Sequence, residues 1–162
     1  MPSAKRPAAL FRLYARPGFL LRRAHQISAA VFEDECRGVQ LTPAQFGVLT
    51  VLDAHPGLGQ SSLARALGFD KVTVLRVLRG LEGRGLVARQ AQGGRRSVAV
   101  SLTEAGIALL QQAQQPAEKA YRRLMAPLDR EQQQQLIDLL QVLTGELEED
   151  ARAAFVPPAA DD

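Results

Sequence analysis

The feature that most constrains this chain is a glycine turn between two short helical patterns, followed by two strand patterns. Apolar residues recur every three or four positions in residues 60–67 and again in residues 70–84, with Gly68 as the turn between them. The second pattern predicts a buried stripe of four residues, Val74, Val77, Leu78 and Leu81. Asp70 can cap this second helix, because its carboxylate accepts hydrogen bonds from N–H groups of the first turn.

Two strand patterns follow the helices and give an order of elements that is typical of one known module. Residues 86–90 and 97–102 each read as a short β-strand. The loop of residues 91–96 joins them and ends in Arg95 and Arg96. Helix, turn, helix and a two-stranded wing predict a winged helix-turn-helix, a module that places its second helix in the DNA major groove.

The rest of the chain favours helices, because Leu and Ala dominate and Trp is absent. Residues 18–37 show helical spacing, and Thr42 with Gln45 forms the signature of a capping box at the start of another helix. A further helix begins after Thr103 and is expected to bend or break near Pro116. The predicted fold class is therefore mainly α with a small β wing: a winged helix-turn-helix lobe plus a helical region.

Outside the winged helix-turn-helix, the chain ends in a last helical pattern and two terminal segments. The last helical pattern carries leucines at the 4-3-4 spacing of a helix–helix seam, at Leu136, Leu140, Leu143 and Leu147. Asp129 and Gln132 are candidates to cap that helix. Residues 1–17 read as a partly ordered basic arm, and residues 149–162 read as a flexible tail.

Charge is distributed unevenly along the sequence. Residues 60–103 carry a net charge of +6, residues 104–162 carry −6, and the whole chain carries +3. A concentrated positive segment suits a polyanion such as double-stranded DNA. An ordinary solvated surface is the alternative interpretation of the same charges.

Residues that could support catalysis are few. His25 and His55 lie far apart in the sequence. Cys36 follows three acidic residues that disfavour its thiolate, so a packed, inert thiol is favoured over a redox role. The sequence contains no metal-ligand spacing, phosphate loop or nucleophile motif. We therefore expect no enzyme activity, no metal and no cofactor.

The compartment is also constrained by what the sequence contains. A single cysteine cannot form an internal disulfide. The sequence shows no signal peptide, and no stretch approaches the roughly 20 apolar residues that cross a bilayer. The expected location is the cytoplasm, without a membrane partner.

Four motifs follow one another at a spacing similar to that of one family. They are Leu41-Thr42-Pro43-Ala44-Gln45-Phe46, Leu63-Ala64-Arg65-Ala66-Leu67-Gly68, Leu81-Glu82-Gly83-Arg84-Gly85-Leu86-Val87 and Leu102-Thr103-Glu104-Ala105-Gly106. Together they resemble the MarR family of bacterial transcriptional regulators over residues 18–148. The resemblance implies a homodimer on a pseudo-palindromic operator, with a winged helix-turn-helix in residues 41–103 and dimerisation helices in residues 18–38 and 104–148.

The resemblance also implies which residues contact DNA. They are Lys71, Thr73, Arg76 and Arg79 on the second helix and Arg95 or Arg96 on the wing. Gly94 stands where many family members carry an acidic residue that orients the wing arginine, which leaves the register of the wing open. Val72 and Leu75 either contact thymine methyl groups or pack under the wing.

Residues 17–26 look like a subgroup of the family that controls aromatic-acid catabolism. In this interpretation the protein is a repressor released by a small aromatic carboxylate or its coenzyme A thioester. Arg22, Arg23 and His25 are the candidate ligand-binding residues, because a guanidinium can pair with a carboxylate. The alternatives are a surface or dimer contact for the arginines and a structural role for His25. The alternative functions for the whole chain are a constitutive DNA-binding winged helix and a helical protein-interaction module.

Overall fold

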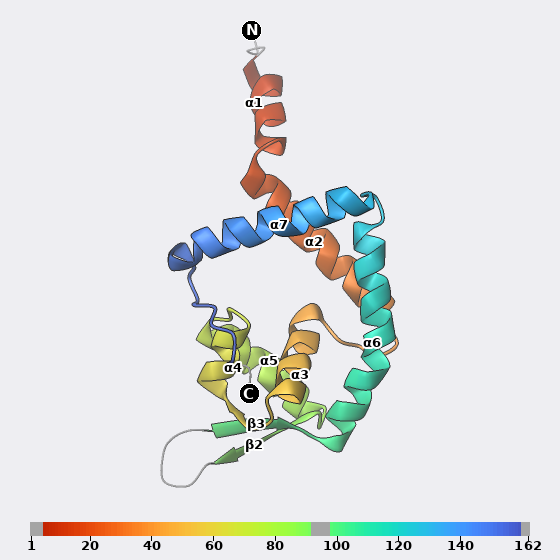
Figure 1. Ribbon diagram of the computed structural model, residues 1–162, viewed down its shortest axis with the longest axis vertical. Helices are drawn as coiled ribbons and strands as arrows, with labels where there is room; N and C mark the ends of the chain where they lie inside the picture. Colours follow the sequence, from red (N-terminus) through yellow and green to blue (C-terminus); the bar gives the residue numbers. More distant parts are fainter. Residues whose placement is uncertain (1–4, 92–97, 160–162) are drawn as a thin grey trace.

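The computed structural model describes residues 5–91 and 98–159, with side chains from residue 10 onward (Figure 1). The described elements follow one another as α1 (Lys5–Tyr14), α2 (Pro17–Glu35), α3 (Pro43–Ala54), β1 (Leu58–Gly59), α4 (Gln60–Ala66), α5 (Lys71–Gly83), β2 (Val87–Ala91), β3 (Val98–Leu102), α6 (Glu104–Met125), α7 (Arg130–Glu146) and the 3-10 turn η1 (Glu148–Asp150). The expected class, mainly α with a small β wing, is confirmed.

Helices α3, α4 and α5 pack over a small antiparallel sheet to form one lobe (Figure 1). The sheet order is β1-β3-β2, with Val87 opposite Leu102 and Leu58 opposite Val100. The two wing strands were expected, whereas the two-residue strand β1 was not. A strand this short leaves no alternating pattern in the sequence that would reveal it.

Local signals explain where the helices of the lobe begin. Thr42 accepts a hydrogen bond from Gln45 N at 3.2 Å, and the Gln45 side chain accepts one from Thr42 N at 3.1 Å. This capping box satisfies N–H groups that the first turn of α3 leaves unpaired. Asp70 caps α5 with its carboxylate alone, which accepts from Thr73 N at 2.7 Å.

The turn of the helix-turn-helix depends on a glycine. Gly68 adopts φ +61° between α4 and α5, in the left-handed region that glycine occupies without strain. Gly106 is fixed for a different reason: a Cβ there would lie 2.1 Å from the carbonyl oxygen of Leu86. The start of α6 therefore lies directly against the chain that leaves α5.

Helix α6 connects the lobe to α2. The small residues Ala113, Ala117 and Ala120 are buried on α6, and Phe32 and Cys36 are buried at the end of α2. The sequence predicted a bend or break near Pro116; α6 runs without a break as one helix from Glu104 to Met125. A proline inside a helix removes one hydrogen bond, and its ring crowds the carbonyl group four residues earlier. Burial of Ala113 and Ala117 on either side of Pro116 offsets this cost.

Four charged residues join α2 and α6 at the surface. Arg123 pairs with Asp34 at 2.7 Å and with Glu35 at 2.9 Å, and Lys119 pairs with Glu35 at 2.8 Å. Hydrogen bonds from Arg123 to Asp34 and from Lys119 to Glu35 are the main causes that lower the pKa of both carboxyl groups. Both carboxylates are therefore held in their charged form.

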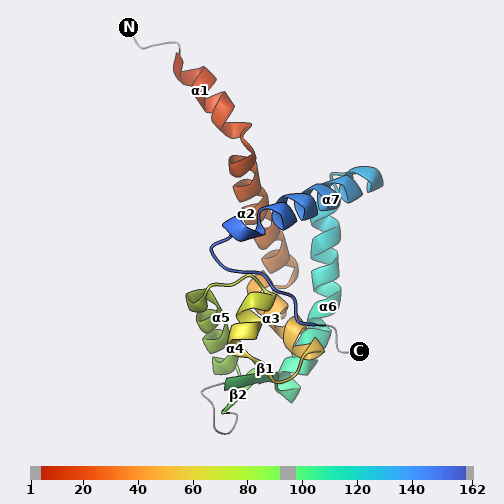
Figure 2. The same cartoon turned by 60° about the vertical axis from the view of Figure 1, so that its left-hand side comes forward.

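Helix α7 differs from the other long helices because none of its residues is buried. It extends away from the end of α6 and passes across α2 (Figures 1 and 2). Its exposed apolar residues are Leu136, Ile137, Leu139, Leu140, Val142 and Leu143. After η1 the chain turns back, and residues 151–159 reach the lobe at α4 (Figure 2).

Candidate nucleic-acid interface

Helix α5 has two faces of opposite character. Val74, Leu78 and Leu81 are at most 1% exposed and fix one face in the core of the lobe. Lys71, Arg76 and Arg79 are exposed on the other side. The sequence predicted this division of the helix, and the structure places these three cations at the surface of the lobe.

Thr73 lies at the start of α5 and is half-buried. Its backbone N–H, and then its hydroxyl, are the main causes that lower the pKa of Asp70. The N-cap carboxylate therefore stays charged, as favoured at the positive end of a helix. Thr73 thus contributes to the cap as well as lying on the face expected to meet DNA.

Val72 and Leu75 differ in the solvent exposure of their side chains. Val72 is 75% exposed on the first turn of α5, whereas Leu75 is half-buried. An exposed β-branched residue beside Lys71 offers a methyl surface of the kind that contacts thymine. The described strands of the wing therefore leave Val72 uncovered, and its contact with thymine stays a prediction.

Two arginines of the positive segment have structural partners. Arg84 donates to the carbonyl oxygens of Gln40 at 2.7 Å and Val39 at 3.1 Å. Arg89 on β2 pairs with Glu82 on α5 at 2.8 Å. In the sequence both arginines read only as positive charge, although Glu82 and Arg89 are opposite charges on either side of a turn.

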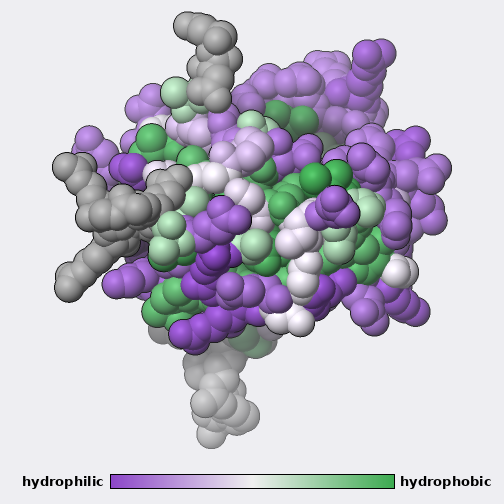
Figure 3. Space-filling view, turned by 90° about the horizontal axis from the view of Figure 1, so that it is seen from below, coloured by the Kyte–Doolittle hydropathy of each residue, from purple (hydrophilic) through white to green (hydrophobic). Residues whose placement is uncertain are grey.

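The pair Glu82–Arg89 ties the second helix to the base of the wing. Arg89 is only 22% exposed, and its Nε has no hydrogen-bond partner among the described residues. The wing residues Arg95 and Arg96 lie outside the described residues. Figure 3 shows that the face on the sheet side mixes hydrophilic and hydrophobic residues.

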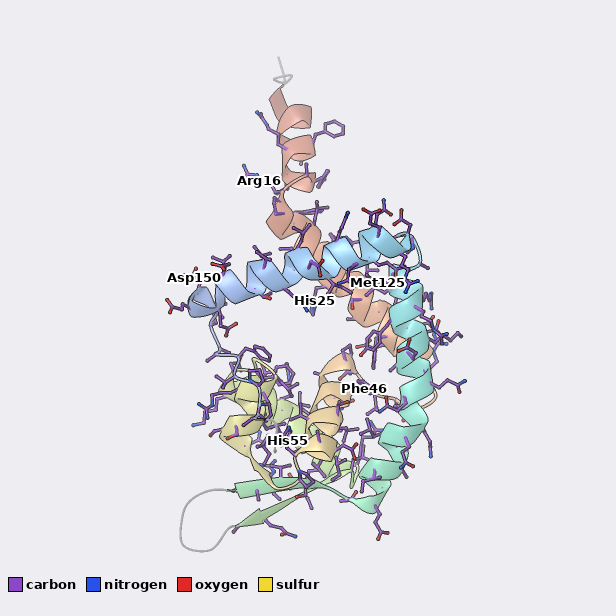
Figure 4. The ribbon with its side chains drawn as sticks, viewed as in Figure 1. Arg16, His25, Phe46, His55, Met125 and Asp150 are labelled. Carbon is purple, nitrogen blue, oxygen red and sulfur yellow. The ribbon has the colours of Figure 1, made fainter. Side chains whose placement is uncertain are left out.

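The candidate ligand residues lie on α2. Arg22 and Arg23 are exposed, and both donate to the Gln26 side-chain oxygen, at 3.3 Å and 3.0 Å. His25 is exposed further along the helix, and Figure 4 shows it apart from Arg16 at the start of α2. Arg22 lines the open cavity at the start of α2, whereas Arg23 and His25 do not, so the three candidates do not line one site.

An open cavity of about 840 Å³ lies where α1 meets α2. It is lined by Leu13, Arg16, Pro17, Gly18, Phe19 and Arg22. The Arg22 guanidinium carbon lies 5.1 Å from the centre of the Phe19 ring, within the range of a cation–π contact. Arg16 was missed in the sequence, where only its position directly before Pro17 distinguished it.

Comparison with known proteins decides the family. The profile of the MarR family matches residues 41–98. The transcriptional repressor NicR of Pseudomonas putida is 39% identical over 94 residues, which span 57% of this chain and 60% of that repressor. The solved structure of the repressor CouR on a 23-mer DNA duplex is 36% identical, with a TM-score of 0.74, covering 82% of this chain and 94% of CouR.

This chain belongs to the MarR family. A solved structure of Bordetella bronchiseptica BpsR, whose DNA binding is regulated by 6-hydroxynicotinic acid, agrees with this assignment. It has 30% identity and a TM-score of 0.77, and the match covers 82% of this chain and 96% of BpsR. CouR has also been solved with p-coumaroyl-CoA, at 35% identity and a TM-score of 0.76. MarR-family proteins are transcriptional regulators and not enzymes.

The described part of this MarR-family chain can be examined for a metal site, a membrane-spanning helix and a reactive cysteine. Among residues 5–91 and 98–159, no three His, Cys, Asp or Glu side chains are grouped so as to hold a metal ion. None of the helices in these ranges combines the length and apolar character needed to span a membrane. Cys36 is fully buried, and burial is the main cause that raises the pKa of its thiol. A raised pKa disfavours the reactive thiolate.

Proposed function

We propose that this chain is a dimeric, sequence-specific repressor whose affinity for DNA falls when it binds a small aromatic carboxylate or its coenzyme A thioester. The observation that carries the DNA-binding part is the outward face of α5. Its three cations, Lys71, Arg76 and Arg79, are exposed while the opposite side of the same helix is anchored in the core. A helix fixed in this way can enter a major groove without rearranging.

The cations on α5 have distinct proposed roles. Arg76 and Arg79 are three residues apart and therefore share one side of the helix. Each can form a bidentate contact with guanine, which contributes about 1–3 kcal/mol of discrimination. Lys71 and Thr73, at the start of the helix, are proposed to contact phosphate or base edges. Arg95 and Arg96 are proposed to reach the neighbouring minor groove.

The dimer is proposed to form through the helices outside the lobe. In this assignment residues 18–38 and 104–148 are the dimerisation helices. The exposed leucines of α7 support it, because a contiguous apolar surface of this kind marks a protein interface. A two-fold dimer presents two α5 helices to half-sites about 34–36 Å apart on one face of the duplex.

The effector is proposed to bind near the junction of α1 and α2. The cavity there combines an aromatic ring, Phe19, with two guanidinium groups, Arg16 and Arg22. An aromatic acid needs this combination, because the ring stacks while the carboxylate pairs with arginine. Arg23 and His25, which also lie on α2, are the secondary candidates. The ligands of BpsR and CouR belong to this chemical class.

The DNA-binding proposal is tested by selecting a preferred duplex from a random pool and measuring affinity at about 0.15 M salt, a physiological strength. We expect Arg76→Ala to lose roughly tenfold to hundredfold in affinity for the selected duplex and to lose its preference over random DNA. Arg122→Ala is the matched control, an exposed arginine on α6 far from the lobe. Arg95→Ala is expected to make binding less salt-dependent. Unchanged affinity in both lobe variants contradicts the assignment.

The effector proposal is tested by adding benzoates, hydroxycinnamates, nicotinates and their coenzyme A thioesters to the protein–DNA complex. A tenfold loss of DNA affinity requires a differential binding free energy of about 1.4 kcal/mol between the two protein states. The active compound should lose its effect on Arg16→Gln and Arg22→Gln variants while their DNA binding persists. If no compound changes DNA binding, the protein is a constitutive winged-helix binder.

A further inference from the structure

The end of the chain bonds to the helix-turn-helix itself. Val156 N–H donates to the carbonyl oxygen of Arg65 at 2.9 Å. Arg65 belongs to the last turn of α4, where carbonyl groups lack partners within the helix. Gly68 N–H donates to the same oxygen at 3.2 Å, so the returning chain shares an acceptor with the turn between α4 and α5.

A side-chain contact accompanies this backbone hydrogen bond. Phe155 lies over the turn, and its Cβ would be 3.8 Å from a methyl group placed on Gly68. Residues Val156 to Ala159 then form one wall of a cavity of about 500 Å³. The opposite wall is formed by residues 55–59 with Ser62 and Arg65. The segment thus follows the lobe from the turn to the loop that precedes α4.

The path of the segment is set at its other end by a carboxylate. Glu148 on η1 accepts a hydrogen bond from Phe155 N–H at 2.6 Å. This bond closes the turn between the end of α7 and the returning chain. Glu149, the next residue, is exposed and has no bond of this kind among the described residues.

These contacts matter because no hydrogen bond or ion pair joins α7 itself to the lobe within the described residues. None of its residues is buried, and it joins the rest of the chain through the turn after α6 at one end and through η1 at the other. A helix that is attached only at its two ends can affect the rest of the chain only through the segments that hold those ends. The returning chain leads directly to the joint of the helix-turn-helix.

We infer that residues 151–159 form a strap that couples the position of α7 to the orientation of the DNA-binding lobe. The strap fixes the distance between α7 and the lobe in the free protein. Its role in regulation rests on the proposed function: if α7 belongs to the dimer interface, the strap makes the spacing of the two α5 helices depend on how that interface is arranged.

The strap is tested with spin labels on one chain, at Gln141→Cys on α7 and Gln90→Cys on β2, both exposed positions. Cys36 is fully buried and stays unlabelled. Excess unlabelled chain leaves one labelled copy in any dimer. The distance distribution should be narrow in the parent protein and about twofold wider after truncation at Asp150, because a released segment samples more states.

Two single variants separate the strap from a general loss of structure. Glu148→Ala removes the carboxylate that shapes the turn, and Glu149→Ala is its neighbouring control. Val156→Pro removes the N–H donor to Arg65, whereas Val156→Ala keeps it. We expect both disrupting variants to widen the distribution and both controls to leave it narrow.

An unchanged distribution in the truncated protein overturns the inference. So does rapid hydrogen exchange of the Val156 amide in the parent protein, because that amide is bonded in the strapped state. Neither measurement uses DNA or effector. Failure of DNA binding would therefore refute the proposed function without affecting the strap. A mobile tail in a protein that binds DNA would refute the strap without affecting the proposed function.

Discussion

Helices α5 and α7 are both amphipathic, yet the chain buries only one of them. Helix α5 places four residues in the core of the lobe, whereas α7, which is longer, places none. The lobe therefore buries its apolar surface within one chain. The region around α7 does not, and its exposed leucines support the proposal that α7 belongs to the dimer interface.

The largest effect is expected where α7 would meet a second copy. Leu136→Glu combined with Leu140→Glu places two carboxylates on the exposed seam. Because a buried leucine contributes about 1.5–3 kcal/mol, the dimer dissociation constant should rise at least about hundredfold. Sedimentation velocity measures it. Gln134→Glu with Gln141→Glu, on the opposite side of the helix, is the control, and an undiminished dimer in the seam variant contradicts the comparison.

The next effect compares one substitution in both regions. In the seam variant, Leu49→Ala should lower the free energy of unfolding by about 2–5 kcal/mol, because Leu49 is fully buried in the lobe. Leu139→Ala on α7 should change it by less than about 0.5 kcal/mol, because Leu139 is 68% exposed. Urea denaturation measures both. Similar losses at the two positions would mean that α7 packs within the single chain.

A smaller effect is expected from the capping boxes, which occur in both regions. Thr42→Ala should destabilise the lobe by about 1 kcal/mol, since α3 is packed in the core. Asp129 and Gln132 form the corresponding box at the start of α7. Asp129→Ala should reduce helicity in circular dichroism and weaken the dimer without changing the stability of the lobe. A lobe destabilised equally by both variants would argue against independent regions.

The smallest effect concerns the charged residues that join α2 to α6, because all of them except Glu35 are exposed to solvent. Folding lowers the pKa of Asp34 and Glu35 below their ordinary values of 3.8 and 4.5. Their stabilisation is therefore present above those values and is lost as pH falls through the lowered folded values. Arg123→Gln should reduce stability near neutral pH and differ little from the parent in strong acid. Arg122→Gln is the control, and a pH-independent loss contradicts the account.

Much of the lobe was predictable from the sequence because its signals are local. The stripe of α5, the cap at Asp70 and the box at Thr42 depend on residues a few positions apart. The strand β1 was missed because it is two residues long, and the continuity of α6 through Pro116 depends on tertiary packing.

The candidate site was predictable only where it lies on one helix. Lys71, Arg76 and Arg79 follow from the period of α5. The structural use of Arg84 and the cavity around Arg16 depend on contacts between separate elements, which charge counts do not reveal. The strap had no sequence signal, because residues 149–162 read as a tail.

In the proposed complex, two copies of α5 dock on one duplex at the same time. Hydroxyl-radical footprinting combined with native mass spectrometry on the selected duplex tests it directly. We expect two chains of 17.6 kDa on each duplex and two protected patches on one face, about 34–36 Å apart. One chain on each duplex, or a single protected patch, would contradict it.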